Sequence, residues 1–256
     1  MNGSVKRLLR AGLPPLAAVF ALIALWQAAV WAGGFPHYIL PGPLAVAEAF
    51  AADANLLRAH VAATMTVAIL GFGLGSAAGL ATAFLLHLVP WLRAAFAPLL
   101  ILTQNTPIIV VAPLLAVWFG FGMEPKLILL VLVCFFPVAI ATLDGLSRAD
   151  RSMVEYMRMA GASPWQTFTK LELPWAMPSM FSGLKVSVAY CVSGAVISEW
   201  VGAEKGLGIY LNLKRSAFQV DSMFVALFTI AALSLVLFVL VALLERRVIR
   251  WHERRE

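Results

Sequence analysis

Residues 155–174 read EYMRMAGASPWQTFTKLELP, a polar stretch in a sequence that is otherwise nearly all apolar. Ser152 and Glu155 have the spacing of a capping box, which predicts a short helix that starts there and runs through Met159. Gly161 supplies the left-handed backbone position that ends such a helix. We therefore expect a short helix that ends in a glycine elbow.

A second short helix is predicted directly after the elbow. Ser163 is a hydroxyl cap, Pro164 suits the first helical position, and Gln166 is placed to bond back to the cap. Leu173 and Pro174 are expected to close this helix, because proline disfavours helical geometry before it and has no N–H to donate. The stretch is thus interpreted as a two-helix loop between longer segments.

Five residues of this loop have the spacing of the EAA loop of ABC importer permeases, a family that the chain resembles. They are Glu155, Gly161, Leu171, Leu173 and Pro174. In that family the loop is a coupling helix that sits in a groove of a cytoplasmic ATPase subunit. The resemblance implies the same role here, shared by the intervening residues Ala162, Ser163, Pro164 and Trp165. Tyr156 and Met157 depart from the two alanines usual in the family, and a plain helix cap stays open as the role of Glu155.

The composition places the whole chain in a membrane. Of its 256 residues, 62% are hydrophobic and 12% are charged, and the mean hydropathy is +0.89. Soluble domains carry roughly 25% charged residues, so this chain cannot bury its apolar surface in a water-soluble core. The net charge of +6 does not indicate a nucleic-acid partner, because most basic residues flank apolar spans, where they mark cytoplasmic ends.

Six spans are predicted from windows of roughly 20 apolar residues. They lie near residues 13–32, 59–86, 95–119, 126–143, 177–200 and 223–244. The first exceeds the roughly 7 to 15 residues of a signal-peptide h-region, so we expect it to be retained. The predicted fold class is an all-α membrane protein, a single permease domain over residues 1–256. Its coupling loop, residues 144–176, lies between spans 4 and 5.

The lysines and arginines set the expected orientation. Most of them lie at the two termini, in the coupling loop and before the third span. The remaining loops hold Arg58, Lys126, Lys205, Lys214 and Arg215. By the positive-inside rule, both termini are predicted to be cytoplasmic, with the chain crossing the cell inner membrane several times.

No enzyme chemistry is indicated. Cys134 and Cys191 lie in apolar segments without a CxxC pattern, so they are predicted to be core residues, and no metal or other cofactor is expected. The sequence has no Walker A motif, so ATP must be hydrolysed by another subunit. Gly71, Gly75 and Gly79 recur every four residues and predict close helix packing, because no strand precedes them to make a nucleotide loop.

A polar run in the third span is the first candidate for a translocation path. Its members are Thr103, Gln104, Asn105 and Thr106. Such residues are costly in a bilayer unless they face protein or water, so they either line a path or hydrogen-bond neighbouring helices. Pro107 and Pro113 predict that this span is bent or locally unwound. Further path candidates in the fifth span are Tyr190 and Ser193.

The segment that follows the fifth span is a candidate outer gate. Its acidic, aromatic and glycine residues are Glu199, Trp200, Gly202, Gly206 and Gly208. A stretch punctuated by glycines suits a re-entrant gate, and a plain exposed turn is the alternative. The segment resembles the corresponding part of permeases of the sulfonate, nitrate, taurine and thiamine-pyrimidine importers.

The resemblance covers nearly the whole chain beyond the first span and implies the membrane subunit of an ABC importer. It implies four kinds of partner: cytoplasmic ATPase subunits, a second copy of the chain, the lipid bilayer, and a periplasmic or lipid-anchored solute-binding protein. The uncharged polar run suits a small polar solute. The resemblance favours a thiamine-pyrimidine or riboflavin-like heterocycle, with aliphatic sulfonates, taurine or nitrate as the alternative.

Two other classes of protein are disfavoured. An ion-driven secondary transporter tends to place paired ionisable residues at mid-membrane, whereas Asp144 and Glu199 lie at the ends of spans. A membrane-embedded enzyme would need histidines or carboxylates gathered at one depth. The histidines are instead scattered over different loops and ends, at His37, His60, His87 and His252.

Overall fold

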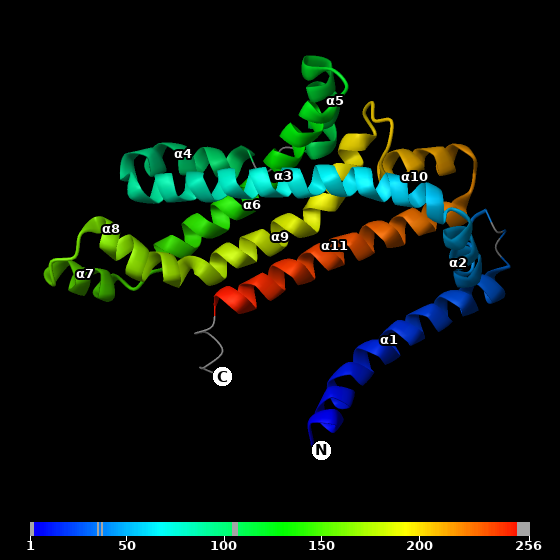
Figure 1. The fold of residues 1–256 in the computed structure, drawn as a ribbon, viewed down its shortest axis with the longest axis horizontal. Coiled ribbons are helices and arrows are strands. Elements are labelled where there is room, and N and C mark those ends of the chain that lie inside the picture. The colour runs from blue at the N-terminus through cyan, green and yellow to red at the C-terminus, as the bar shows by residue number, and fades with distance from the viewer. Residues whose placement is uncertain (1–2, 35, 37, 104–106, 250–256) are drawn as a thin grey trace. The chain divides into compact units, whose positions relative to one another are not determined.

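The computed structural model describes the backbone of residues 3–34, 36, 38–103 and 107–249, and all regular elements there are helical (Figure 1). In chain order they are α1 (Gly3–Gly33), α2 (Pro43–Ala52), α3 (Ala54–Leu88), α4 (Pro90–Thr103), α5 (Ile108–Phe119), α6 (Met123–Ser147), α7 (Arg151–Met159), α8 (Pro164–Thr167), η1 (Phe168–Glu172), α9 (Leu173–Glu199), α10 (Leu207–Ser216) and α11 (Val220–Val248). The segment η1 is a π-helix. The predicted all-α fold class is confirmed.

The chain divides into two compact units, which are described separately below. The first comprises Met1–Arg58 and Tyr210–Phe228, and the second comprises Ala59–Ile209 and Thr229–Glu256. Among the described residues, those predicted to dock an ATPase, line a path or form a gate all belong to the second unit. A single permease domain over the full length stays a prediction.

Four helical stretches in the described residues are long and apolar enough to cross a membrane. They are α3, α6, the continuous stretch Pro164–Glu199 and α11. These contain most of the predicted second, fourth, fifth and sixth spans. The first predicted span lies within α1, whose apolar part is Ala17–Gly33.

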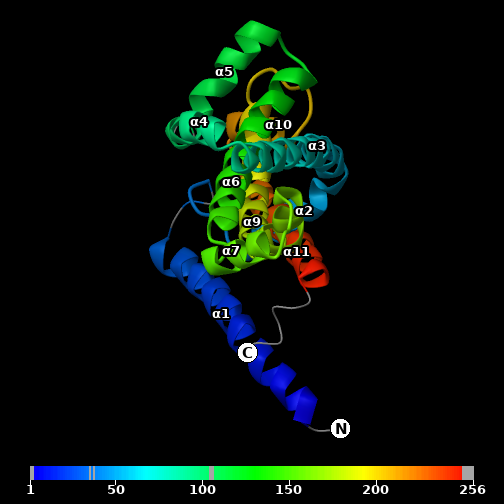
Figure 2. The ribbon, with the colours of Figure 1, turned by 90° about the vertical axis from the view of Figure 1, so that its left-hand side faces the viewer.

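The third predicted span consists of two helices, not one. α4 ends at Thr103, α5 begins at Ile108, and Pro107 between them has extended backbone with φ −65° and ψ 112°. Figures 1 and 2 both show α5 running steeply away from α4. The interruption predicted from Pro107 is therefore confirmed, while Pro113 is accommodated inside α5.

The glycines of α3 lie against α6, as their spacing predicts. A Cβ atom at Gly75 would stand 2.8 Å from the carbonyl oxygen of Val131, and one at Gly79 would stand 2.9 Å from another α6 carbonyl oxygen. Gly71 faces the same helix. Gly73, which points elsewhere, has open space around it. Small residues at this spacing therefore let the two helix backbones approach closely.

α6 and α9 form the most extensive helix pair of the second unit. A Cβ atom at Gly183 of α9 would stand 2.8 Å from the carbonyl oxygen of Pro137 in α6. Cys134 and Cys191 are completely buried in this region, and Cys191 Sγ donates to the carbonyl oxygen of Ala68 in α3 (3.1 Å). The two cysteines are core residues, as predicted.

In the first unit, Asp53 at the end of α2 connects residues of α10 and α11. Its Oδ2 accepts hydrogen bonds from Tyr210 Oη (2.6 Å) and Ser222 Oγ (3.0 Å) and pairs with Lys214 Nζ (2.7 Å). Burial alone would raise the pKa of Asp53, but these three hydrogen bonds more than offset it and lower the pKa below its ordinary value. Burial and the bond to Asp53 raise the pKa of Tyr210. We call these residues the Asp53 network.

Candidate functional site

The predicted two-helix loop is α7 followed by α8, but α7 starts differently from the prediction. Its N-cap is Asp150, whose side chain accepts a hydrogen bond from the backbone N–H of Ser152 (2.9 Å). The predicted capping box of Ser152 and Glu155 is therefore wrong. Aspartate is as good a cap as serine, and Asp150, which comes first along the chain, already satisfies the free N–H of Ser152.

Gly161 ends the first helix, as predicted. Its φ is +83°, its N–H donates to the carbonyl oxygen of Arg158, and the N–H of Ala162 donates to that of Met157 (3.0 Å each). A Cβ atom at Gly161 would meet nothing within 4 Å. The position therefore needs glycine for its backbone angle and not for space.

Ser163 starts the second helix with the predicted capping box. Its backbone N–H donates to Gln166 Oε1 (2.8 Å), and the N–H of Gln166 donates to Ser163 Oγ (3.2 Å). Pro164 occupies the first turn, where a missing N–H costs nothing. The local signals for this helix start are confirmed.

The second helix does not close at Leu173 and Pro174, so that prediction is wrong. It continues through η1 into α9 without a break. In a regular α-helix the ring of Pro174 would clash with the carbonyl four residues earlier. The π-helical turn Phe168–Glu172 bonds residues five apart instead, which carries the helix past the proline. Leu171, Leu173 and Pro174 are half-buried in this turn and after it.

Large apolar side chains of α7 and α8 are exposed. They are Met153, Tyr156, Met159 and Trp165, with exposed fractions of 53%, 65%, 81% and 63%. We call these four the α7–α8 surface. Beside it, Glu155, Ser163 and Pro164 are exposed and Ala162 is half-buried. Exposed methionine and aromatic side chains in a polar segment are typical of a docking site for another protein.

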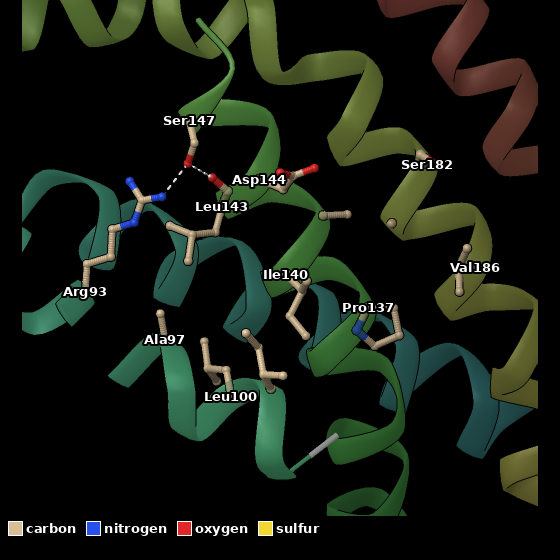
Figure 3. A pocket seen from close by; sticks show the side chains of 13 residues that line it. Arg93, Ala97, Leu100, Pro137, Ile140, Leu143, Asp144, Ser147, Ser182 and Val186 are labelled. Carbon is tan, nitrogen blue, oxygen red and sulfur yellow. Dashed lines mark hydrogen bonds between the residues drawn. The ribbon is translucent and has the colours of Figure 1, made fainter. Parts of the chain in front are cut away.

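A cavity of about 600 Å³ lies between α4, α6 and α9 (Figure 3). Its polar lining residues are Arg93, Asp144, Ser147 and Ser182, and the other lining residues are apolar or glycine. Arg93 Nη2 donates to Ser147 Oγ (2.6 Å), and Asp144 pairs with Arg148 (2.7 Å). These lining residues were not predicted to line a cavity, because in the sequence Arg93 and Asp144 indicate only the ends of spans.

The face of α9 that lines the cavity also holds two predicted path residues further along the helix. Ser182 and Val186 line the cavity, and Tyr190 and Ser193 follow on the same face, three or four residues apart. Tyr190 is 62% exposed and Ser193 is exposed. This face of α9 therefore presents polar groups that the described chain does not cover.

The polar run of the third span lies mostly outside the described residues, which exclude Gln104, Asn105 and Thr106. Thr103 is exposed at the end of α4, and its hydroxyl donates back to the carbonyl oxygen of Leu99 (2.7 Å). Thr103 does not line the cavity, whose α4 side is formed by Arg93 and the residues one to two turns after it.

The end of α9 is held by a buried polar network. Glu199, only 1% exposed, accepts hydrogen bonds from Thr64 Oγ1 (2.7 Å) and the backbone N–H of Gly208 (2.8 Å). Thr64 Oγ1 also accepts from the N–H of Leu207 (2.8 Å), and His60 Nδ1 accepts from that of Gly206 (3.0 Å). We call these groups the Glu199 network.

The predicted gate residues separate into two sets. Glu199, Gly206 and Gly208 are buried in the Glu199 network, whereas Trp200 and Gly202 are exposed. Gly206 has φ +141°, and its missing side chain leaves the space that the Glu199 carboxylate fills. The roles of His60 and Thr64 were not predicted, because nothing in the sequence of a helical span indicates a hydrogen-bond partner more than 130 residues away.

Comparison with known proteins places the chain among transport subunits. The family model of the binding-protein-dependent transport system inner membrane component matches residues 71–250. A probable ABC transporter permease protein of Haemophilus influenzae is 38% identical and covers 88% of this chain and 92% of its own. The riboflavin transport system permease protein RibX of Chloroflexus aurantiacus is 38% identical and covers 94% of this chain and 90% of its own.

Two further comparisons bear on cargo and fold. The formylaminopyrimidine transport permease protein ThiX of Halalkalibacterium halodurans is 29% identical and covers 94% of this chain and 97% of its own. Among solved structures, an inward-facing MetNI methionine ABC transporter matches with a TM-score of 0.62 and 21% identity, over 76% of this chain and 94% of the matched chain. At 21% identity, the similarity to the MetNI structure shows a shared fold.

Proposed function

The chain belongs to the family of binding-protein-dependent transport system inner membrane components, and we propose that its α7–α8 surface docks onto a separate ATPase subunit. It is a multi-pass permease subunit of an ABC importer. ATP hydrolysis is assigned in this proposal to the docked partner. The single observation that carries the proposal is the exposed α7–α8 surface, formed by Met153, Tyr156, Met159 and Trp165. Gly161 forms the turn between the two helices that present it.

The chemistry of the α7–α8 surface fits a protein groove. Methionine adapts to irregular surfaces, and tryptophan and tyrosine are the side chains that contribute most to binding at interfaces. The two helices are ordered without the partner, by the Asp150 cap, the Gly161 elbow and the Ser163 capping box. Because little backbone ordering is left for the binding step, its entropic cost is small.

The proposed translocation path follows the cavity and the exposed polar face of α9. Its members are Ser182, Tyr190 and Ser193, with Arg93 and Ser147 at the end where the polar lining gathers (Figure 3). Polar groups in a membrane span face protein or water. A second copy of the chain is proposed to cover this face, so that the path lies between the two permeases. Gln104, Asn105 and Thr106 remain proposed path residues.

The Glu199 network is proposed to be the closed form of an outer gate. Glu199, Gly206 and Gly208 tie the segment after α9 to α3 through hydrogen bonds that all lie within one unit. Trp200 and Gly202 at its exposed edge are proposed to meet the cargo or its binding protein. Opening would require these bonds to be exchanged for contacts with water or a partner.

The proposed cargo is a small polar heterocycle of the riboflavin or thiamine-pyrimidine kind. It is supported by the names of two relatives and by a cavity whose apolar walls suit a flat ring, while Ser147 and Ser182 offer hydrogen bonds. Aliphatic sulfonates, taurine or nitrate are the alternative. Uptake of labelled riboflavin, formylaminopyrimidine and taurine by cells with the intact importer distinguishes them.

Cysteine labelling tests the docking proposal. Met159→Cys on the α7–α8 surface and Glu204→Cys in the segment after α9 both place a thiol at an exposed position. Cys134 and Cys191 are completely buried, so they contribute little background. In intact cells a membrane-impermeant thiol reagent should label only Glu204→Cys. In inverted vesicles it should label Met159→Cys, and the bound ATPase subunit should protect that site.

Two results would overturn the proposal. Labelling of Met159→Cys from outside intact cells would place the loop on the wrong side of the membrane. Uptake that persists after loss of the partner ATPase would favour an ion-driven transporter.

A further inference from the structure

The π-helical segment η1 packs against the C-terminal turn of α3. Phe168 is only 3% exposed, and its ring centroid lies 5.6 Å from that of Phe84, edge to face, and 6.0 Å from that of His87. Phe84 and His87 lie one turn apart on α3. Trp165 of the α7–α8 surface lies 5.5 Å from Phe168. A continuous row of rings thus leads from the exposed surface to the end of α3.

A polar contact holds the same two elements together. His87 Nε2 donates to Glu172 Oε2 (2.8 Å), and both side chains are mostly buried, with exposed fractions of 13% and 16%. Glu172 is the last residue of η1, and His87 lies in the last turn of α3. Among the described residues His87 Nδ1 is buried without a hydrogen-bond partner. Within the described residues, the hydrogen bond to Glu172 is therefore the one that the His87 ring forms.

The opposite part of α3 enters the Glu199 network. Thr64 Oγ1 donates to Glu199 at the end of α9, and His60 bonds Gly206. From Thr64 to His87 the helix is about 35 Å long at 1.5 Å per residue. α3 and the stretch η1–α9 are thus bonded to each other at both ends.

We propose that His87 and Glu172 are positioning residues that make α3 move with the α7–α8 surface and carry its displacement to the Glu199 network. This inference rests on the proposed function. The glycine residues of α3 pack closely against α6, so α3 can deform little along its length. A shift of the C-terminal turn of α3 therefore also displaces Thr64. The irregular bonding of the π-helical turn is where the segment can adjust as it moves.

The test uses the complete importer, with permease, ATPase and binding protein, in lipid nanodiscs and proteoliposomes. His87→Leu and Glu172→Leu should each retain the ATPase subunit, since the α7–α8 surface is untouched. They should lower cargo uptake per ATP hydrolysed by about tenfold, a coupling loss of ordinary size. The reciprocal swap, His87→Glu with Glu172→His, restores the pair and should recover most of the coupling.

Lys185 and Glu245 provide a matched control. Their 2.8 Å ion pair also joins two helices, α9 and α11, with side chains 26% and 23% exposed. Lys185→Met should leave uptake per ATP within about twofold of the unmodified importer, because this pair does not contact η1. An equal loss in both pairs would mean that any interhelical bond matters, and the proposal would be wrong.

A second measurement follows the Glu199 network, which lies at the far end of α3, through a thiol in the segment between Glu199 and Gly206. With Glu204→Cys as background, ATP should change the thiol-labelling rate in the unmodified importer but not in His87→Leu. Should His87→Leu fail to accumulate, Glu172→Gln replaces it, and a wild-type response there overturns the inference. If the unmodified importer shows no ATP-driven uptake, the proposed function itself fails. If the unmodified and variant importers couple equally well, only the role of His87 and Glu172 fails.

Discussion

At the Glu199 end of α9, polar side chains point inward and are satisfied by the chain itself, whereas at the Pro164 end of the same helical stretch large apolar side chains are mostly exposed. Glu199 is 1% exposed and accepts two hydrogen bonds. Trp165 is 63% exposed. The two ends are about 50 Å apart along the continuous helical stretch Pro164–Glu199, which has 36 residues.

The hydrogen bonds at the Glu199 end are formed within the chain, whereas the exposed apolar side chains at the Pro164 end need a partner to bury them. A buried carboxylate with its donors in place stabilises the chain in isolation, because an unsatisfied group would cost about 1–3 kcal/mol. Exposed rings and methionines add nothing to folding until another surface covers them. The Glu199 end should therefore govern stability, and the Pro164 end should govern association and transport.

Glu199→Leu gives the largest expected effect. The hydroxyl of Thr64 and the N–H of Gly208 would lose their acceptor in a buried site, so the purified permease should lose about 2–5 kcal/mol of stability. Thermal unfolding in detergent, without the ATPase, measures this. Glu199→Gln is the control, since it keeps one acceptor oxygen and should lose less than half as much. Equal melting temperatures for the unmodified permease, Glu199→Leu and Glu199→Gln would mean that the Glu199 end does not govern stability.

Gly161→Val tests the other end and should leave thermal stability of the permease nearly unchanged while abolishing uptake. Valine has free space there but resists φ +83°, at a cost of about 1–3 kcal/mol that the loop relieves by changing shape. Gly161→Asn is the control, because asparagine tolerates left-handed backbone. Uptake assays in cells, with immunoblots for membrane insertion, measure both. Normal uptake by Gly161→Val contradicts a coupling role for the elbow.

Trp165→Ala should weaken ATPase binding by about tenfold or more, as loss of a central aromatic does at many interfaces. The stability of the isolated permease should change by no more than about 1 kcal/mol, since Trp165 is mostly exposed. Trp118→Ala in α5 is the control: the same side chain, 69% exposed, is removed away from the α7–α8 surface. Affinity measured in nanodiscs separates the variants, and equal affinities would exclude Trp165 from the interface.

The Asp53 network, in the first unit, offers the smallest and most pH-dependent effect. The folded pKa of Asp53 is lowered below 3.8, so its contribution is present at neutral pH and is lost as the pH falls below 3.8. Asp53→Asn should melt a few degrees lower than the unmodified protein at pH 7. This difference in melting temperature should disappear in acid. A difference independent of pH would mean that the charge of the Asp53 carboxylate contributes nothing to stability.

Much of the architecture could be predicted because its signals are periodic or local. The spacing of Gly71, Gly75 and Gly79 predicted the α3–α6 contact, and Ser163 with Gln166 predicted a helix start. The errors arose where two local rules competed. Asp150 replaced Ser152 as a cap, and a π-helical turn allowed the helix to pass Pro174.

Composition, span periodicity and the signals around Gly161 determined, from the sequence alone, a helical membrane chain with an ordered loop. Tertiary structure alone decided which distant groups meet: Glu199 with Thr64, His87 with Glu172, and the α4, α6 and α9 residues around the cavity. Caps, elbows and proline breaks act through backbone bonds within a few residues, so sequence records them. Long-range polar pairs depend on how each helix is rotated and crossed against its neighbours, and no spacing along one chain encodes that.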